Sequence, residues 1–387
     1  MATKRGFRRS VQIRSHKFED TYGTDPEGAS SGVNIWSVHK GDMEAANLTS
    51  ELVNDTDLIL GPSAEEATTL VELSRSTSGS LSFTRVKPHN LATVVAFAFN
   101  GGRTASPLVD VMASLGSSTY RHVMKPAVGD FELASFNLYD ELDANVLGYL
   151  YLGCLMNDFT LSCERKGWWN LQANYMGSGA RTEIVSGGSG RLGCAFYDGD
   201  SNTEDALDIA EPPLKGGDST VYIVDGGAAG TGGLDGSPDQ GAEDLTGTVL
   251  AGFNAKVVSF NWGYSNNIDE TSLHEFNSGL LKARGERMRR SQTLSMTVEF
   301  ADNVELAWLT DQDTLSIEVD TVSSVSAGAK YFGFDLMFPL TKLLSASVSG
   351  GSDKMLVDLE FQILQHGSAG SVQIDVYNQR SAAYCGT

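Results

Sequence analysis

Alternating apolar and polar residues mark two strands in the later part of the chain, at residues 255–262 and 294–300. The second strand places one apolar set on a single face: Leu294, Met296, Val298 and Phe300. Between Asn261 and Thr293 the chain makes a charged excursion that is too long for an ordinary hairpin loop. The pattern therefore predicts two strands joined by a long arm.

A looser version of this pattern occurs earlier in the chain. Residues 33–38 alternate like a strand, a charged excursion follows from Lys40 to Thr77, and residues 80–83 close it. The spacing of tyrosine, glycine and methionine in residues 151–156 also returns, one residue longer, in residues 331–337. Such echoes indicate an internal duplication. We therefore expect two tandem copies of one β domain.

The elements between and after the arms are mostly strand-like. An apolar run at residues 91–99 fits either a strand or a short helix. A helix is expected at residues 107–116, because Pro in the first turn and Gly at the end match the usual cap residues. A second short helix is expected at residues 304–309. Alternation between turn residues predicts the remaining strands: residues 131–139, 149–156, 159–162, 168–175, 314–320, 331–337, 343–348 and 355–361.

Composition shifts divide the chain into five parts. A basic arm, suited equally to nucleic acid or to a partner, precedes the first β domain, and a glycine-rich, acidic stretch separates it from the second. Residues 221–224 of that stretch could form one extra strand, and residues 371–377 could extend a neighbour's sheet or pack on their own domain. The expected boundaries are 1–32 for the N-terminal arm, 33–185 for the first domain, 186–250 for the insert or linker, 251–367 for the second domain, and 368–387 for the C-terminal strand and tail.

The composition is that of a globular, mainly β chain. Its 387 residues are 41% hydrophobic and include 42 glycines against 9 prolines, which favours a β fold with many turns. The formal charge of −21 disfavours a protein that grips DNA through its phosphates. The same charge is compatible with DNA sliding past without adhering, and equally with a role in solubility.

The sequence predicts neither a membrane span nor a disulfide framework. No stretch approaches about 18 consecutive apolar residues, and the basic N-terminus lacks the apolar core of a signal peptide. The four cysteines form no CxxC pair, so a zinc site is not expected and synthesis in a reducing cytosol fits best. These cysteines are Cys154, Cys163, Cys194 and Cys385.

No pattern predicts catalysis, a metal or a cofactor. The six histidines include no HExxH pair, and the chain contains no GxSxG turn. The glycines of residues 226–233 lack the spacing of a phosphate-binding loop. Residues 198–209 begin like a calcium loop, but Thr203 and Ile209 stand where that loop needs Gly and Glu. The chain is therefore not expected to be an enzyme.

The two arms carry opposite charges. Basic residues cluster in the second arm and acidic residues in the first, so the arms of neighbouring subunits could meet and set their register. Solvated arms with little energetic effect are an equally weighted alternative. The candidate contact residues are Lys282, Arg284, Arg287, Arg289 and Arg290 in the second arm, and Asp42, Glu44, Glu51, Asp55 and Asp57 in the first.

Four segments taken together point to a family. They are the paired strands and arms of residues 36–83 and 253–300, the Gly-Cys stretch with alternating strands at residues 149–175, and the Phe-Pro-Leu of residues 338–340 before the closing strands. In this order they resemble the major tail tube protein of long-tailed bacteriophages. The resemblance covers residues 33–364, roughly.

The resemblance implies two tandem tube-like domains, each a β-sandwich or barrel with a short helix and a long arm, in a structural virion protein. The sheets would line the lumen of a ring, the arms would make the inter-ring contacts of a stacked tube, and three two-domain subunits would imitate sixfold symmetry. DNA would pass through a negative bore without specific binding. The implied partners are further copies of the chain and the tape-measure, tail-terminator and tail-tip proteins, in a tail made in the host cytoplasm.

Two other classes of protein stay open at this point. A β-sandwich adhesin or carbohydrate-binding protein would present Trp168 or Trp169 to a sugar, but adjacent strand residues point to opposite faces, so at most one would reach a ligand. A tail-associated hydrolase is the third class, and the missing catalytic motifs disfavour it.

Overall fold

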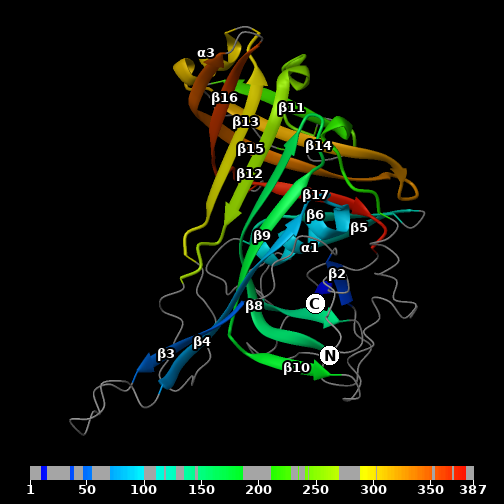
Figure 1. Ribbon diagram of the computed structural model, residues 1–387. Helices are drawn as coiled ribbons and strands as arrows, with labels where there is room; N and C mark the ends of the chain where they lie inside the picture. The colour runs from blue at the N-terminus through cyan, green and yellow to red at the C-terminus, as the bar shows by residue number, and fades with distance from the viewer. Residues whose placement is uncertain are drawn as a thin grey trace, which may run out of the picture.

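Strands hydrogen-bonded side by side make up most of the computed structural model (Figure 1). They form one continuous sheet of 17 strands in the part of the chain that is described, together with two α-helices. The mainly β fold expected from the sequence is therefore confirmed. The structure describes residues 10–14, 35–38, 47–54, 70–99, 110–116, 119–127, 135–143, 147–185, 211–227, 234, 240–242, 244–269, 288–301, 303–350, 354–367 and 370–380.

The first half of the chain contains ten of the strands and helix α1. In order these elements are β1 (Ser10–Arg14), β2 (Ile35–Val38), β3 (Asn47–Asn54), β4 (Leu70–Phe83), α1 (Pro88–Phe99), β5 (Asp110–Gly116), β6 (Thr119–Met124), β7 (Ser135–Asp143), β8 (Leu147–Glu164), β9 (Asn170–Gly177) and β10 (Arg181–Val185).

The second half contains seven strands and helix α3. In order these are β11 (Ser219–Gly227), β12 (Val257–Ser265), β13 (Ser291–Glu299), α3 (Val304–Asp311), β14 (Thr314–Ser326), β15 (Tyr331–Gly350), β16 (Met355–Ile363) and β17 (Gln373–Asn378). Two short 3-10 turns, η3 (Gly216–Asp218) and η4 (Phe253–Lys256), precede β11 and β12.

Two very long strands, β8 and β15, organise the two halves in the same way. Strand β8 pairs with β7, β9 and β10, and β9 continues to β4. Strand β15 pairs with β14, β16 and β17, and β16 continues to β13. All of these pairs are antiparallel. Five strands of the first half therefore have counterparts, joined by the same pairings, in the second.

The irregularities of pairing match as well. Strand β9 skips Asn157 of β8 at a bulge, and β16 skips Leu344 of β15. Counting from these bulges equates Met156 with Leu343 and Tyr151 with Phe338. The sequence echo between residues 151–156 and 331–337 is therefore in the wrong register, because the bulges and not the tyrosines set the alignment.

The two halves are joined through β12. One edge of β12 pairs with β13, and the other pairs with β8 from Ser259 opposite Glu164 to Ser265 opposite Asp158. Strand β17 makes a second connection, since it pairs with both β15 and β6. One large hydrophobic cluster runs through both halves.

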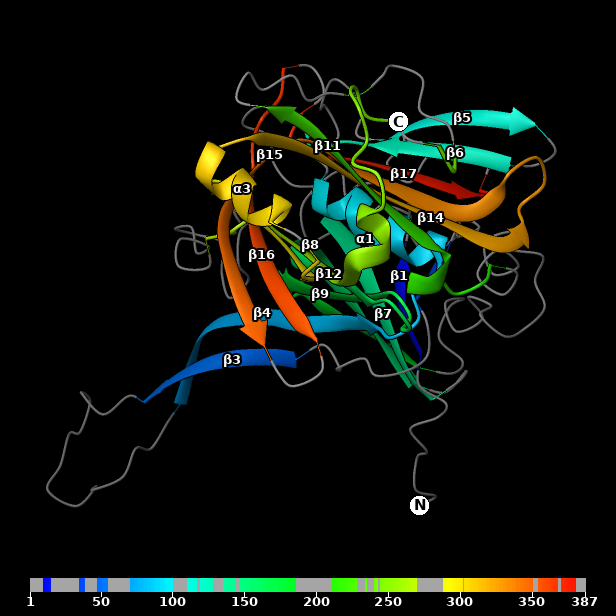
Figure 2. The ribbon, with the colours of Figure 1, turned by 90° about the horizontal axis from the view of Figure 1, so that it is seen from above.

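Helix α1 and a group of aromatic rings fill the space beneath this junction. All twelve residues of α1 are buried, and the helix contacts β8, β17, β6 and β15 (Figure 2). The indole of Trp262 in β12 lies 6.2 Å from the ring of Phe99 in α1, 5.0 Å from Phe159 in β8 and 5.5 Å from Phe338 in β15, measured between ring centroids. The core thus ties one strand of the second half to elements of both.

Alternation located most strands, but three expectations need correction or refinement. The helix expected at residues 107–116 is wrong, because residues 110–116 form β5 and pair with β6; Gly116 has φ 89° in the following turn rather than capping a helix. The segments 149–156 and 159–162 belong to one strand, β8, as do 331–337 and 343–348 in β15, since a bulge changes the facing side chains without ending a strand.

Other expectations are confirmed. The ambiguous run at residues 91–99 is helical, and it lies in α1, which begins with Pro88. The helix at residues 304–309 and the extra strand at residues 221–224 are present as α3 and β11. Leu294, Met296 and Val298 are buried on one face of β13. Residues 255–256 belong to η4, so β12 begins two residues later than expected.

Replacement of Trp262 by alanine should destabilise the protein by about 3–5 kcal/mol, because it removes a fully buried indole that packs against both halves. Chemical denaturation of the unassembled chain measures the change. Trp168→Ala is the matched control, since this indole is only partly buried. An equal loss in the two variants would show that Trp262 does not hold the junction together.

Candidate assembly surfaces

The first arm begins as a two-stranded ribbon that leaves the body of the molecule. Strands β3 and β4 pair from Asn47 opposite Ser78 to Asn54 opposite Leu70, and both views show the ribbon projecting outward (Figures 1 and 2). Two large apolar side chains on it are about half exposed, Leu52 at 54% and Leu73 at 51%. Exposed leucines on a projecting ribbon are typical of a surface that a partner covers.

An ion pair stiffens the same ribbon. The guanidinium of Arg75 donates two hydrogen bonds to the carboxylate of Glu72, at 2.6 Å and 2.7 Å. Hydrogen bonds from Arg75 and from Ser50 lower the pKa of Glu72 to about 2. Glu72 is therefore charged at any pH at which the protein would assemble.

The base of the second arm is closed by asparagines. The Asn267 side-chain amide donates to the carbonyl of Arg289 at 2.7 Å and to the Ser291 hydroxyl at 3.1 Å. Its backbone has φ 48°, a left-handed conformation that asparagine tolerates better than most residues. The buried Asn266 amide donates to the carbonyls of Ala98 and Met156. These bonds fix where the arm leaves the body.

The bulge of β8 receives the same segment. The backbone N–H of Asn266 donates to the carbonyl of Asn157 at 2.8 Å, and that of Ile268 donates to the Asn157 side chain at 3.0 Å. Asn157 is the residue that β9 skips, so its polar groups are available to the arm. The sequence analysis missed this set, for which the Asn-Asn pair at residues 266–267 was a turn signal.

The described part of the chain contains three of the residues expected to make inter-ring contacts. Arg289 is exposed, as that role requires. Arg290 is partly buried and donates to the carbonyl of Ala127, so it supports the chain's own fold. Glu51 lies in β3 opposite Ser74. Lys282, Arg284, Arg287, Asp42, Glu44, Asp55 and Asp57 lie outside the described residues.

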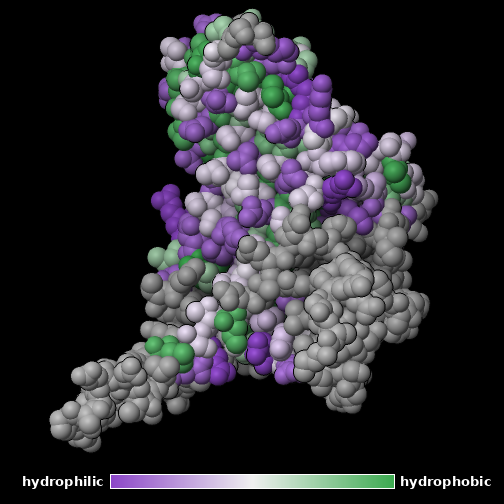
Figure 3. Space-filling view, viewed as in Figure 1, coloured by the Kyte–Doolittle hydropathy of each residue, from purple (hydrophilic) through white to green (hydrophobic). Residues whose placement is uncertain are grey.

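One edge of β15 is open. Strand β14 stops pairing with β15 at Lys342, and in the described part of the chain no strand pairs with that side of residues 345–350. Two apolar side chains near the open edge are exposed, Leu344 at 58% and Val348 at 44%. The surrounding surface is largely hydrophilic, with isolated hydrophobic patches (Figure 3). An unpaired edge offers backbone groups to another strand.

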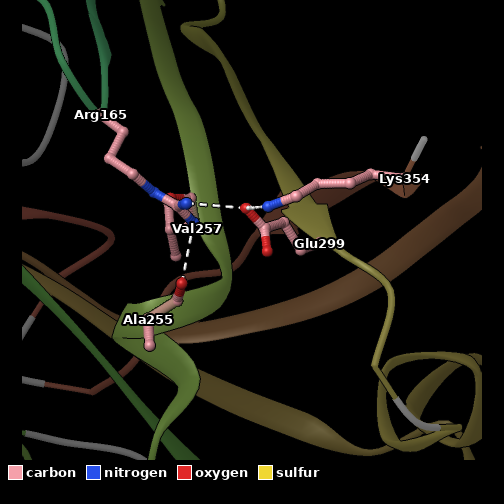
Figure 4. A network of polar contacts seen from close by, with 5 residues as sticks. All are labelled: Arg165, Ala255, Val257, Glu299 and Lys354. Carbon is pink, nitrogen blue, oxygen red and sulfur yellow. Dashed lines mark hydrogen bonds and ion pairs between the residues drawn. The ribbon is translucent and has the colours of Figure 1, made fainter.

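A polar cluster fastens the far end of β12 to its neighbours (Figure 4). The guanidinium of Arg165, just after β8, donates to the carbonyls of Val257 and Ala255 at 2.7 Å and 2.8 Å. It also bonds to Glu299 of β13 at 2.7 Å, and the same carboxylate accepts a bond from Lys354 at 2.9 Å. Arg165 therefore links β8, β12 and β13 where the sheet would otherwise splay.

Three aspartates lie side by side across the neighbouring strands. Asp320 of β14 is opposite Asp335 of β15, which is opposite Asp375 of β17, and all three are buried. Arg121 donates to Asp375 at 2.6 Å. The sequence analysis missed this row, because each aspartate stands alone in its own alternating strand and only the pairing of the strands brings the three together.

Burial dominates the ionisation of these carboxyl groups. It raises the pKa of Asp335 well above the usual range, and the adjacent Asp320 raises it further. Burial also raises the pKa of Asp320 and Asp375, and for Asp375 it outweighs the opposing effect of Arg121. Asp335 therefore holds a proton that it shares with Asp320 by a hydrogen bond.

A cavity of about 300 Å³ lies between β12 and the end of β8, where its lining includes Cys163, Trp169 and Gly216. Burial raises the pKa of the Cys163 thiol to about 12, so the sulfur is not an activated nucleophile. A side chain at Gly216 would approach the Glu164 carbonyl within 2.3 Å, so glycine is needed there. No group of His, Cys, Asp and Glu in the described residues could hold a metal.

The tryptophan pair behaves as strand alternation predicts. Trp169 is buried, and its ring lies 5.1 Å from that of Phe334. Trp168 is partly buried, with Arg85 and Lys215 placed 5.5 Å and 5.9 Å from its ring. These cations cover the indole on which a sugar would have to stack, and nothing else in the fold favours the adhesin alternative.

These features are those of a β-rich structural protein with strand edges and arms suited to assembly. A family model described as phage tail tube protein matches residues 7–363. The chain therefore belongs to the phage tail tube protein family and is a structural component of the viral tail. In the described residues no helix is long and apolar enough to cross a membrane.

Comparisons with individual proteins add little. No curated protein matches the chain. Two solved structures are similar to parts of it. The crystal structure of an Hcp protein is 15% identical, with a TM-score of 0.23, over 40% of this chain and 98% of that one. The structure of a type six secretion system protein is 16% identical, with a TM-score of 0.21, over 39% of this chain and 88% of that one.

The Asp335→Asn variant should depend less on pH than the natural protein. A raised native pKa means that the folded state binds the proton more tightly, so stability declines as pH rises above about 4, the ordinary pKa of aspartate, towards the raised native value. Asparagine removes this titration. The stability of the variant relative to the natural chain should therefore rise between pH 4 and pH 8.

Chemical denaturation at several pH values measures this difference, and Asp311→Asn, at an exposed aspartate, is the control. Parallel stability curves for Asp335→Asn and the natural chain would show that Asp335 titrates normally in the folded state.

Proposed function

We propose that three copies of this chain form a ring with pseudo-sixfold symmetry, and that stacked rings make the hollow tail tube through which the genome leaves the virion. The family match carries the tube assignment. The repeated strand pairing around β8 and β15 supports two equivalent units in each chain. We assign these units to residues 33–185 and 251–367, with residues 186–250 as the insert between them.

Part of the insert contributes to the second unit in this proposal. Strand β11 extends its sheet by pairing with β14, and Leu245 packs with Val224 and Met337. The backbone N–H of Asp244 donates to the buried carboxylate of Glu318 at 2.9 Å. These contacts support a role for the described part of the insert in covering one face of that sheet, beyond that of a linker.

The arms would join one ring to the next. The ribbon of β3 and β4 leaves the body with Leu52 and Leu73 exposed, and the Asn267 contacts hold the second arm in a set direction. The basic residues of the second arm would meet the acidic residues of the first arm in the adjacent ring. Arg290 is excluded from this set because it already bonds to Ala127.

The charge of −21 supports passage of DNA through the tube without adhesion, because like charges on the wall and the phosphates repel. Rings that stack through unlike surfaces can add without limit, so other proteins must start and stop the tube. Tape-measure, tail-terminator and tail-tip proteins would fill these roles. Assembly would take place in the host cytoplasm.

Electron microscopy of the purified protein tests the proposal directly. Rings with three chains and six similar lobes, some of them stacked, are the expected result. Particles that stay monomeric across a range of concentration and salt would overturn it.

Charge reversal in the second arm should block stacking while leaving single rings intact. The double variant Arg287→Glu with Arg289→Glu changes residues outside the main core, and it leaves Arg290 in place to anchor the arm. The expected result in electron micrographs is single rings without tubes, because the introduced glutamates would face acidic residues of the next ring.

The double variant Arg287→Lys with Arg289→Lys keeps the charge and should stack normally. Tubes from the glutamate variant, at the same length and salt as the natural protein, would show that the arms are not an electrostatic joint.

A further inference from the structure

The two halves differ at one equivalent strand edge. On β8, the edge at residues 158–164 is covered by β12. Because Met156 corresponds to Leu343, residues 158 and 160 of β8 correspond to residues 345 and 347 of β15. That second edge is the open one. The same chain therefore shows one copy of the edge filled and the other unfilled.

The strand that fills the first edge has a counterpart in the first arm. Tyr175 of β9 corresponds to Phe361 of β16, and their partners are Gly79 of β4 and Leu294 of β13. One residue earlier, Ser78 therefore corresponds to Thr293.

Following these partners one strand further reaches β3 and β12. Ser78 pairs with Asn47 of β3, and Thr293 pairs with Gly263 of β12. Asn47 thus corresponds to Gly263, and Thr49 corresponds to Ser265. The start of β3 is the counterpart of the end of β12.

We propose that β3 of one subunit pairs with the open edge of β15 in the next subunit, antiparallel, with Asn47 opposite Ser347 and Thr49 opposite Ser345. The register is that of the filled junction, in which Gly263 lies opposite Thr160 and Ser265 opposite Asp158. The occupant of the open edge is a second copy of this chain. This pairing rests on the proposed ring and specifies the contact that closes it.

The exposed apolar side chains agree with this register. Val348 is 44% exposed, whereas its counterpart Leu161, beneath β12, is fully buried. Leu52 is 54% exposed, and its position three residues beyond Thr49 matches that of Ile268 beyond Ser265. Ile268 is 6% exposed because it packs against Leu155 and Met176. The pairing would bury both exposed side chains.

The bulges contribute to the same contact. In the filled junction, the β8 bulge at Asn157 receives hydrogen bonds from the arm base at residues 266 and 268. The equivalent bulge residue of β15 is Leu344, which is 58% exposed, and the equivalent arm residues are 50 and 52. Leu344 and Leu52 would therefore approach each other, so an apolar contact replaces the asparagine hydrogen bonds at the subunit boundary.

Paired cysteines test the register. The predicted pair is Thr49→Cys with Ser345→Cys, placed in a chain that also carries Cys194→Ser and Cys385→Ser; the remaining Cys154 and Cys163 are buried. Directly opposed strand residues have Cβ atoms about 4.5–5.5 Å apart, close to disulfide distance, whereas diagonal residues are about 7–8 Å apart. The matched control, Thr49→Cys with Ser347→Cys, is displaced by two residues on the same strand.

Mild oxidation of assembled rings should link the predicted pair into covalent oligomers that end at the trimer, with several-fold less product from the control pair. More product from the control pair, or no product from either pair in rings visible by microscopy, would overturn the register while leaving the tube function intact. Failure of every variant and of the natural chain to form rings would instead overturn the proposed function, and this pairing with it.

A surface substitution tests the edge independently. Val348→Lys places a charge at the open edge, and Val325→Lys, at a valine that is 43% exposed at the end of β14, is the matched control. By sedimentation velocity Val348→Lys should stay monomeric with an unchanged melting temperature, while Val325→Lys forms rings. Rings from Val348→Lys at the natural concentration would exclude the β15 edge as the subunit contact.

Discussion

The pairing of β12 with β8 is the interaction on which the rest of the structure depends. It unites the two halves in one sheet and brings Trp262 against rings from α1, β8 and β15. Backbone hydrogen bonds alone would leave this seam polar and open to water, but the aromatic packing beneath it removes apolar surface from solvent. Arg165 then fixes the far end through two carbonyls and Glu299.

A filled strand edge inside the chain changes how the remaining edge should be understood. An exposed edge strand with apolar side chains is an aggregation hazard in a monomer, and natural proteins usually protect such edges. Residues 345–350 carry no such protection in the described chain, apart from the polar serines that alternate with Ala346 and Val348. This is the pattern expected of an edge that is covered in the assembly, where unlike surfaces meet and the ring closes.

Sequence patterns located most strands, since alternation with one buried face is a local property that β13 and β16 show clearly. They failed where distant pairing decides. Residues 110–116 carry helix-like caps, but pairing with β6 makes them a strand, and the bulges at Asn157 and Leu344 hid the true register of the repeat. Among the candidate contacts, charge alone could not separate exposed Arg289 from Arg290, which bonds within the chain.

The row of buried aspartates shows that acidity in this protein serves more than one purpose. Surface carboxylates add to the net charge of −21, whereas the Asp335 carboxyl holds a proton and contributes a hydrogen bond to Asp320. Three adjacent buried carboxylates would repel if all were ionised, and Arg121 compensates only one of them directly. The buried row therefore adds less to the charge than the composition implies, and repulsion of DNA must come from the carboxylates that remain exposed to solvent.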